Sequence, residues 1–281
     1  MFRTDIGRQI LPVVVAHRGA SASYPENTLA SFQGAIDAGA DIVELDVRLS
    51  ADGVPVIMHN AEVDATTDGS GWVHELTVAE LKRLDASRGR GSRAEIPTLE
   101  EAFRFLSGKA GINVEIKNMP GEPAFDSPRE AAAEQVVILL DQIGFDGPML
   151  VSSFNWLSIE RVKQLEPQVP TGFLTIGPFD PYACLVYVRS RGHDYVLPQV
   201  PAVLDAGEAF TRAAHDDGVL VGTWVMDEPE GLERLFAIGV DAVATNDPAT
   251  AVPIRDRISV GPELLDALAP GLGMLLRERV A

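Results

Sequence analysis

Short apolar runs alternate with amphipathic stretches along most of the chain, and each pattern predicts one kind of element. The expected strands are the apolar runs at 12–17, 42–48, 112–117, 149–153, 171–175, 194–197, 219–224 and 240–244. The expected helices lie between them, at 27–39, 98–107, 128–143, 156–166, 203–217 and 228–238, with a weaker pattern at 181–191. Strands that alternate with helices favour a parallel sheet, and eight such units favour an α/β fold of the (β/α)8 TIM barrel type. A doubly wound sheet is the alternative, although the chain has no Gly-x-Gly-x-x-Gly after its first strand and no Walker A pattern.

One interval departs from this alternation. After the second strand, an Asp-Gly pair at 52–53 stands between two apolar runs, which is typical of a hairpin. Residues 60–96 then form a long polar stretch with a short helical pattern near 77–85. We interpret 60–96 as a small insertion after strand two, beside the barrel mouth and within a single barrel domain over 11–256. Residues 257–281 are expected to form a C-terminal extension, either a short closing helix or a mobile end.

The charge balance narrows the range of partners. The chain has 23 basic and 41 acidic residues and a net charge of −18, which argues against nucleic acid or an anionic membrane surface. An anionic small molecule is compatible with this charge only where local cations hold it. The single cysteine, Cys184, excludes an intrachain disulfide and is expected to pack in the core. No targeting segment and no apolar stretch of about 20 residues is found, so we predict a cytoplasmic protein without stable membrane insertion.

Charged or titratable side chains lie at the ends of the first three predicted barrel strands. Glu44 and Asp46 are two residues apart and therefore share one face of their strand, as Glu115 and Lys117 do on the next. His17 ends the first strand. Strand ends meet at one mouth of a barrel, so we expect these five side chains to converge there. The three carboxylates predict a site for one hard divalent cation, Mg²⁺ or Ca²⁺, unless they are solvated strand ends or ion-paired fillers of the barrel.

Two of the five histidines, His17 and His59, each end a predicted strand. A pair of imidazoles on opposite sides of a scissile bond can serve as general base and general acid near neutral pH. The other three histidines are expected to be ordinary structural residues. Arg18 at the mouth can bind a phosphate group through two N–H donors, and Lys117 adds a second cation unless it only pairs with a neighbouring carboxylate.

Taken together, the motifs resemble the glycerophosphodiester phosphodiesterase family over about residues 13–250. The resemblance rests on HRG (17–19), PENT (25–28), ELD (44–46), His59, TTDGSG (66–71), LTVAELKRLDA (76–86), IPTLEEAF (96–103), VEIK (114–117), SSF (152–154), Trp224 and TNDP (245–248). It implies a TIM barrel that uses a divalent cation to hydrolyse glycerophosphodiesters to glycerol 3-phosphate and an alcohol. The residues that match the family's functional positions are His17 and His59 for catalysis, Glu44, Asp46 and Glu115 for the metal, Arg18 and Lys117 for the phosphate, and Phe154 and Trp224 for the pocket wall.

Two departures from the family pattern stand out. The family usually has His-Asp at the second histidine, whereas this chain has Asn60 after His59. An asparagine can hydrogen-bond to the imidazole but offers no charge to stabilise its protonated form, so pH optimum and rate are expected to change more than reaction class. The second departure is WVMDEP (224–229), where the family often has a Trp-Thr-Val-Asn-like run, and it concerns the headgroup side of the pocket.

Three other functions compete with this hypothesis. A lysophospholipase D would share the site but needs an apolar groove or a membrane-facing patch. A retaining glycosidase would use paired carboxylates but would leave the histidines and Arg18 without a role. A non-catalytic ligand-binding barrel is disfavoured because both histidines and all three carboxylates are present. The headgroup alcohol, the choice between water and the glycerol 2-hydroxyl as nucleophile, and the oligomeric state are left open at this point.

Overall fold

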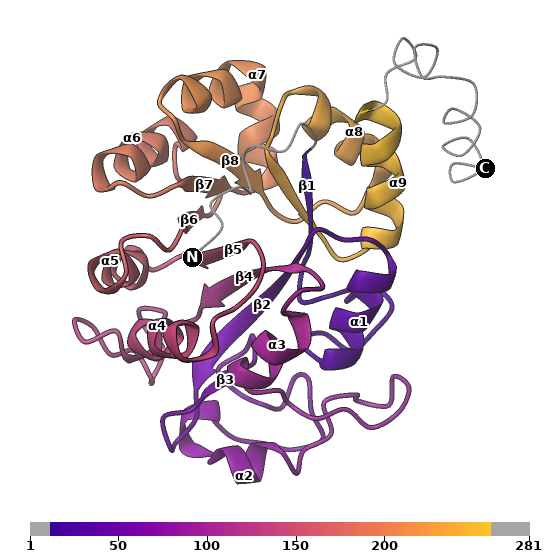
Figure 1. The fold of residues 1–281 in the computed structure, drawn as a ribbon, viewed down its shortest axis with the longest axis vertical. Coiled ribbons are helices and arrows are strands. Elements are labelled where there is room, and N and C mark those ends of the chain that lie inside the picture. The colour runs from indigo at the N-terminus through magenta and orange to yellow at the C-terminus, as the bar shows by residue number, and fades with distance from the viewer. Residues whose placement is uncertain (1–11, 260–281) are drawn as a thin grey trace.

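Eight parallel strands close into a barrel within residues 12–259, the part of the chain that the computed structural model describes (Figure 1). The barrel strands are β1 (Val13–Ala16), β2 (Ile42–Leu49), β4 (Gly111–Ile116), β5 (Met149–Ser153), β6 (Thr171–Thr175), β7 (Tyr195–Pro198), β8 (Leu220–Thr223) and β9 (Ala242–Thr245). Each pairs in parallel with its neighbours in chain order, and β1 closes the ring by pairing with both β9 and β2. The fold is therefore the predicted TIM barrel and not a doubly wound sheet.

Helices follow the strands and cover the outside of the barrel (Figure 1). Their bounds are α1 (Leu29–Asp37), α3 (Leu99–Leu106), α4 (Ala131–Ile143), α5 (Trp156–Leu165), α6 (Pro181–Arg191), α7 (Val200–Asp216), α8 (Pro229–Ala237) and α9 (Pro248–Ser259). Thr28 and Thr98 begin α1 and α3 with capping boxes, in which the hydroxyl accepts from a backbone N–H of the first turn. The helix expected at 128–143 begins only at Ala131, because Glu130 adopts a left-handed conformation with φ 55°.

The segment after β2 is the expected hairpin and insertion. Strand β3 (Pro55–Ile57) runs antiparallel to β2, and Gly53 takes the positive φ of 75° that the tight turn requires. The insertion shares a small core with β3 and the residue after it, formed by Val56, Met58, Val63, Val73, Leu81, Ala86 and Ile96. The predicted helix at 77–85 is confined to α2 (Val78–Leu81) and follows a 3-10 turn at Val73–Glu75. The insertion therefore packs as a lobe on the barrel.

Apolar side chains fill the interior of the barrel, and the polar groups lie at its mouth. Alternate residues of each strand point inward, and the apolar ones among them form one interior cluster made of Val13, Val15, Ile42, Leu150, Leu174, Tyr195, Leu197 and Ala242. Their neighbours along the strands, such as Val14 and Val43, pack outward against the helices. Because the inward apolar residues come early in β1 and β2, the later inward positions lie nearer the mouth.

The C-terminal part of the barrel differs from expectation. The expected boundary at residue 256 falls inside α9, a helix that the sequence pattern did not predict beyond β9. Arg255 of α9 pairs with Asp41, whose carboxylate also accepts from the Val14 amide at 2.8 Å, so this helix is tied to the base of the barrel. The expected extension at 257–281 lies outside the described residues beyond Ser259. Among the described helices, none is both long and apolar enough to cross a membrane.

Candidate active site

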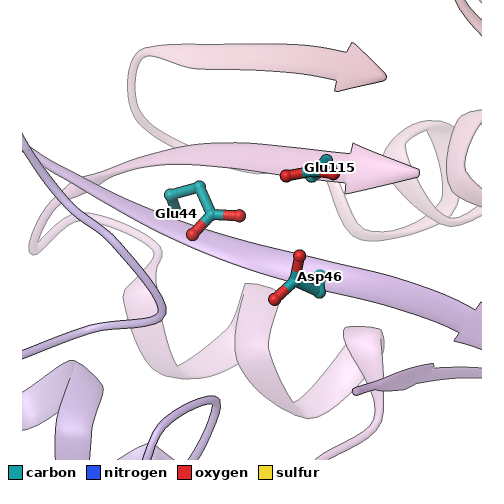
Figure 2. A group of neighbouring side chains, drawn as sticks. All are labelled: Glu44, Asp46 and Glu115. Atoms are coloured by element: carbon teal, nitrogen blue, oxygen red, sulfur yellow. The ribbon is translucent and has the colours of Figure 1, made fainter. Parts of the chain in front are cut away.

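Three carboxylates from two adjacent strands meet inside the barrel mouth, as the strand periodicity predicts. Glu44 and Asp46 project from β2, and Glu115 projects toward them from β4 (Figure 2). Parallel pairing places Asp46 directly beside Glu115. One oxygen of each carboxylate lies within 4.8 Å of the others, and all three side chains are buried. Three negative groups at such separations, away from water, require positive charge nearby.

Two cations of the chain supply part of that charge. The Lys117 ammonium lies 3.0 Å from Asp46 Oδ1 and pairs with Glu115. The Arg18 Nε lies 3.3 Å from Asp46 Oδ2, and its Nη1 donates to Glu26 at 3.0 Å. Lys117 therefore does pair with neighbouring carboxylates, Asp46 among them, and it also lines the pocket.

Backbone geometry holds Arg18 in place. Arg18 has a left-handed conformation with φ 58°, which turns its amide to donate to Glu44 Oε2 at 2.8 Å. Such a conformation is uncommon for a residue with a side chain, and it is kept here by surrounding contacts. The next residue must be glycine, because a Cβ at Gly19 would lie 2.4–2.7 Å from atoms of Ser31. The HRG motif is therefore a turn that aims both a side chain and an amide into the mouth.

The carboxylates differ in proton affinity. Burial, together with repulsion from Asp46, raises the pKa of Glu44 to about 8. Burial also raises the pKa of Glu115 to about 7, against the opposing attraction of Lys117. The pKa of Asp46 is lowered despite its burial, because Lys117 and Arg18 stabilise its charged form and Asn27 Nδ2 donates to it at 2.8 Å. Asp46 is therefore ionised at neutral pH, whereas Glu44 is mostly protonated and Glu115 about half protonated, and a bound cation would displace these protons.

The donor set fits a hard divalent cation. Glu44 Oε1, Asp46 Oδ1 and Glu115 Oε1 are buried and receive no hydrogen bond, although Lys117 approaches the last two at ion-pair distance. Buried oxygens without a donor are costly, and a cation satisfies several at once. All three ligands are oxygens, which suit Mg²⁺ or Ca²⁺ better than zinc.

Each of the two histidines at the mouth is held by an asparagine. His17 Nδ1 lies 2.8 Å from Asn246 Oδ1, and His59 Nδ1 lies 2.7 Å from Asn60 Oδ1. Burial lowers the pKa of both imidazoles, and the Arg18 guanidinium lowers it further, while Asp46 acts in the opposite direction. Neutral imidazole is therefore favoured at pH 7 in both, which leaves a lone pair to accept a proton.

The site opens into a pocket and an adjoining groove. The pocket, of about 150 Å³, is lined by both histidines, Glu44, Glu115 and both cations. Phe154 and Trp224 form part of its wall and pack edge to face, with ring centroids 5.2 Å apart. The groove, of about 740 Å³, runs between the insertion and the segment after β4, and shares His59, Lys117 and Phe154 with the pocket. A ligand can therefore bridge the two spaces past His59.

The remaining histidines have structural surroundings, as expected. His193 is buried between Thr171 and Tyr187, His215 pairs with Asp241, and His74 lies beside Trp72 in the insertion. Cys184 is buried and free, which also matches expectation.

Sequence reasoning assigned no role to several residues that support the site. Asn27 donates to Asp46, Glu26 binds Arg18, and Asn246 binds His17. Asp227 lies behind Asn246 and accepts from it twice, at 2.7 Å each. Their motifs, PENT (25–28) and TNDP (245–248), were available as signals of resemblance, but neither shows which side chain each residue contacts.

The groups at the mouth define a class of protein. Two cations, two imidazoles, Glu44 and Glu115 line one pocket at the strand ends of a barrel, and Asp46 joins the two glutamates in a cluster that can hold a metal. Such a set suits the cleavage of a phosphate ester by acid–base catalysis. It does not suit a retaining glycosidase, which would use two of the carboxylates and leave the imidazoles and Arg18 without a role.

Comparison with known proteins gives the particular family. The model of the glycerophosphoryl diester phosphodiesterase family matches residues 17–250. A glycerophosphodiester phosphodiesterase from Caldanaerobacter subterraneus is 33% identical over 250 residues, which span 85% of this chain and 96% of that protein. Among solved structures, a phosphodiesterase from Oleispira antarctica, in complex with the product sn-glycerol-3-phosphate, matches with a TM-score of 0.79 and 30% identity. That match covers 89% of this chain and 99% of the other.

A glycerophosphodiester phosphodiesterase from Thermotoga maritima has the same fold, with a TM-score of 0.71 and 28% identity over 87% of this chain and 98% of that one. The chain belongs to the glycerophosphoryl diester phosphodiesterase family. It is therefore an enzyme, a phosphodiesterase of glycerophosphodiesters, and not a barrel that only binds a ligand.

Proposed function

We propose that this enzyme hydrolyses glycerophosphodiesters to glycerol 3-phosphate and an alcohol in a metal-dependent reaction with histidine acid–base catalysis. The observation that carries the proposal is that two imidazoles, two cations, Glu44 and Glu115 line one pocket, and that Asp46 completes a buried cluster of three carboxylates with the two glutamates. Glu44, Asp46 and Glu115 would hold one divalent cation. When bound, Mg²⁺ or Ca²⁺ supplies Lewis-acid stabilisation of the charge on the phosphate oxygens.

The cationic side chains bind and orient the phosphate. Arg18 and Lys117 are fixed by carboxylates on one side and face the pocket on the other. Because they are already in place, they stabilise negative charge on the phosphate oxygens without reorganising as that charge grows. Phe154 and Trp224 exclude water from the apolar side of the pocket.

The two imidazoles divide the proton transfers. His17 lines only the pocket, whereas His59 lines both the pocket and the groove. We assign the groove to the departing alcohol because it has the larger volume and begins at His59. His17 then accepts the proton of the attacking hydroxyl, and the imidazolium form of His59 donates a proton from Nε2 to the leaving oxygen and returns to neutral imidazole. The attacking hydroxyl belongs to water, or to the glycerol itself when a cyclic phosphate forms first, and both routes use the same two imidazoles.

The test measures glycerol 3-phosphate released from glycerophosphocholine by the full-length protein. Chelated enzyme is assayed alone and after Mg²⁺ or Ca²⁺ is restored, beside His17→Ala, His59→Ala and the control His215→Gln. His215 lies at the end of α7, where it pairs with Asp241, so its variant should retain wild-type rates.

Metal-restored release that is lost in both active-site variants is the expected result. Release that ignores chelation would overturn the metal assignment, and full activity in His17→Ala would overturn the acid–base assignment. No release from glycerophosphocholine, glycerophosphoethanolamine or glycerophosphoglycerol with either metal would overturn the proposed substrate class.

A further inference from the structure

Two polar side chains lie in sequence behind His17, Asn246 on the loop after β9 and Asp227 on the loop after β8. Asn246 follows β9 and places Oδ1 2.8 Å from His17 Nδ1. Asp227 follows β8 and accepts from Asn246 twice, from the backbone N–H at 2.7 Å and from Nδ2 at 2.7 Å. The hydroxyl of Thr245 donates to the same carboxylate at 2.9 Å.

Asp227 decides which atom of the Asn246 side chain faces the imidazole. An ionised carboxylate only accepts hydrogen bonds, so it binds the amide NH2 and excludes the amide oxygen from its side. The oxygen must then point the other way, toward His17. The backbone of Asn246 cannot turn to compensate, because its N–H binds Asp227 and its carbonyl accepts from the Ala22 amide at 3.0 Å.

The orientation of that amide in turn determines where His17 carries its hydrogen. A neutral imidazole has one N–H and one lone pair, and an amide oxygen can only accept. Nδ1 must therefore hold the hydrogen, and Nε2 keeps the lone pair. Ser21 Oγ lies 3.0 Å from the same amide oxygen and 2.8 Å from the His17 carbonyl oxygen, so its one hydrogen can be donated to either acceptor.

We propose that Asp227 and Asn246 are positioning residues that fix His17 in the tautomer with hydrogen on Nδ1, so that Nε2 is always ready to accept a proton. This inference rests on the proposed role of His17 as the base. With the amide reversed, its NH2 would donate to Nδ1, the hydrogen would move to Nε2, and His17 could no longer act as that base. Neither positioning residue needs to touch substrate to have this effect.

The second histidine lacks such a device. Asn60 Oδ1 accepts from His59 Nδ1, but in the described part of the chain no hydrogen bond holds the Asn60 NH2 group. Its amide can therefore turn over and serve either tautomer of His59. A proton donor that must regain hydrogen on Nε2 after each turnover is compatible with this freedom, whereas a base is better served by one fixed tautomer.

The tautomer of His17 can be determined directly from long-range ¹H–¹⁵N correlation spectra. The sample is the full-length protein labelled with ¹⁵N-histidine, without metal, at a pH where His17 is neutral. The His17 signals are identified by their absence in His17→Gln. In the wild type we expect hydrogen on Nδ1 of His17. In Asp227→Asn, the Asn246 amide is free to reverse, and we expect part or all of the hydrogen on Nε2. We also expect kcat to fall by about tenfold or more with KM changed by less than about threefold.

Two further variants separate positioning from a general structural effect. Asp227→Asn combined with Asn246→Asp exchanges the amide and the carboxylate, so residue 246 again accepts from Nδ1 while residue 227 donates to it. This double variant should return the hydrogen to Nδ1 and recover most of kcat. The control is Asp247→Asn, which removes a carboxylate from the same loop where it caps α9 through Thr250 and does not contact His17. It should leave the tautomer unchanged.

Three results would overturn the inference. The first is wild-type His17 with hydrogen on Nε2, which is decisive even if Asp227→Asn does not fold. The second is Asp227→Asn with an unchanged tautomer, whatever its rate. The third is a double variant in which kcat stays as low as in Asp227→Asn although the tautomer has returned. A wild type that shows the fixed tautomer but hydrolyses no glycerophosphodiester would instead count against the proposed function, so the two failures are distinguishable.

Discussion

Acidification should weaken metal binding steeply, because two of the three candidate ligands, Glu44 and Glu115, take up protons near neutral pH in the metal-free site. The pKa of Glu44 is raised to about 8 and that of Glu115 to about 7, in both cases mainly by burial. A carboxylate must lose its proton to bind the cation, so binding releases whatever protons these groups hold. Asp46, whose pKa is lowered, contributes no proton in this range.

The size of the effect follows from these two pKa values. At pH 7, Glu44 is about 90% protonated and Glu115 about 50%, so about 1.4 protons should leave for each cation bound. The fraction of sites with both glutamates ionised falls from about 0.45 at pH 8 to about 0.001 at pH 6. The dissociation constant for Mg²⁺ or Ca²⁺ should therefore rise by about 500-fold between these pH values.

Isothermal titration calorimetry in buffers of different ionisation enthalpy measures both quantities on the same protein. The control is Glu62→Gln, which removes an exposed carboxylate beside the groove but outside the three-carboxylate cluster, and should leave proton release unchanged. A dissociation constant that changes by less than about threefold from pH 8 to pH 6, without proton release, would refute the reasoning. Such a result would mean that the glutamates are already ionised before the cation arrives.

Three further variants test other parts of the site. Gly19→Ala places a Cβ within 2.7 Å of α1 at φ +80°, so urea denaturation should show a loss of about 3 kcal/mol in the free energy of unfolding. Gly53→Ala, whose Cβ would have nothing within 4 Å, should lose only about 1 kcal/mol. Equal losses would contradict the steric argument. Asn60→Asp places a carboxylate beside His59 Nδ1 and should raise the pKa of that imidazole. At saturating metal, the alkaline limb of the kcat/KM profile should therefore move to higher pH while the acid limb stays in place. An unchanged profile would speak against His59 as the acid. Glu44→Gln removes a buried negative charge, so the melting temperature of the metal-free protein at pH 8 should be higher than that of the wild type. Adding Mg²⁺ should not raise the melting temperature of this variant further. A metal-induced rise like that of the wild type would exclude Glu44 as a ligand.

Much of the fold could be predicted because barrels are built from two simple periodicities. The eight strands were recognisable as short apolar runs, and the helices as longer amphipathic ones. Helix α9 was missed because Pro253 lies inside it and its apolar residues do not form a clear stripe. The late start of α4 was missed because the left-handed conformation of Glu130 depends on contacts distant in sequence, including the bond from Asn118 Nδ2 at 2.7 Å.

The site residues on strands could be predicted from the sequence, whereas those on loops could not. Glu44, Asp46 and Glu115 were predictable because strand periodicity determines which residues share a face. Asp227 and Asn246 were not, because they lie on loops after β8 and β9, where no periodicity relates residue number to direction. Their roles depend on how closely the two loops approach each other in the folded barrel, and this distance is seen only in the structure.

The register between β2 and β4 has a consequence for how the barrel reaches its native state. Glu44 and Asp46 share a face of β2, and the third carboxylate stands opposite Asp46 on β4. A slip of one residue would turn every side chain of the slipped strand to the other face and separate the three oxygens. A cation that binds all three therefore binds only the correctly paired strands, and by mass action it lowers the population of every misaligned form. A cation bound for the proposed hydrolysis would also favour the correct strand alignment during folding.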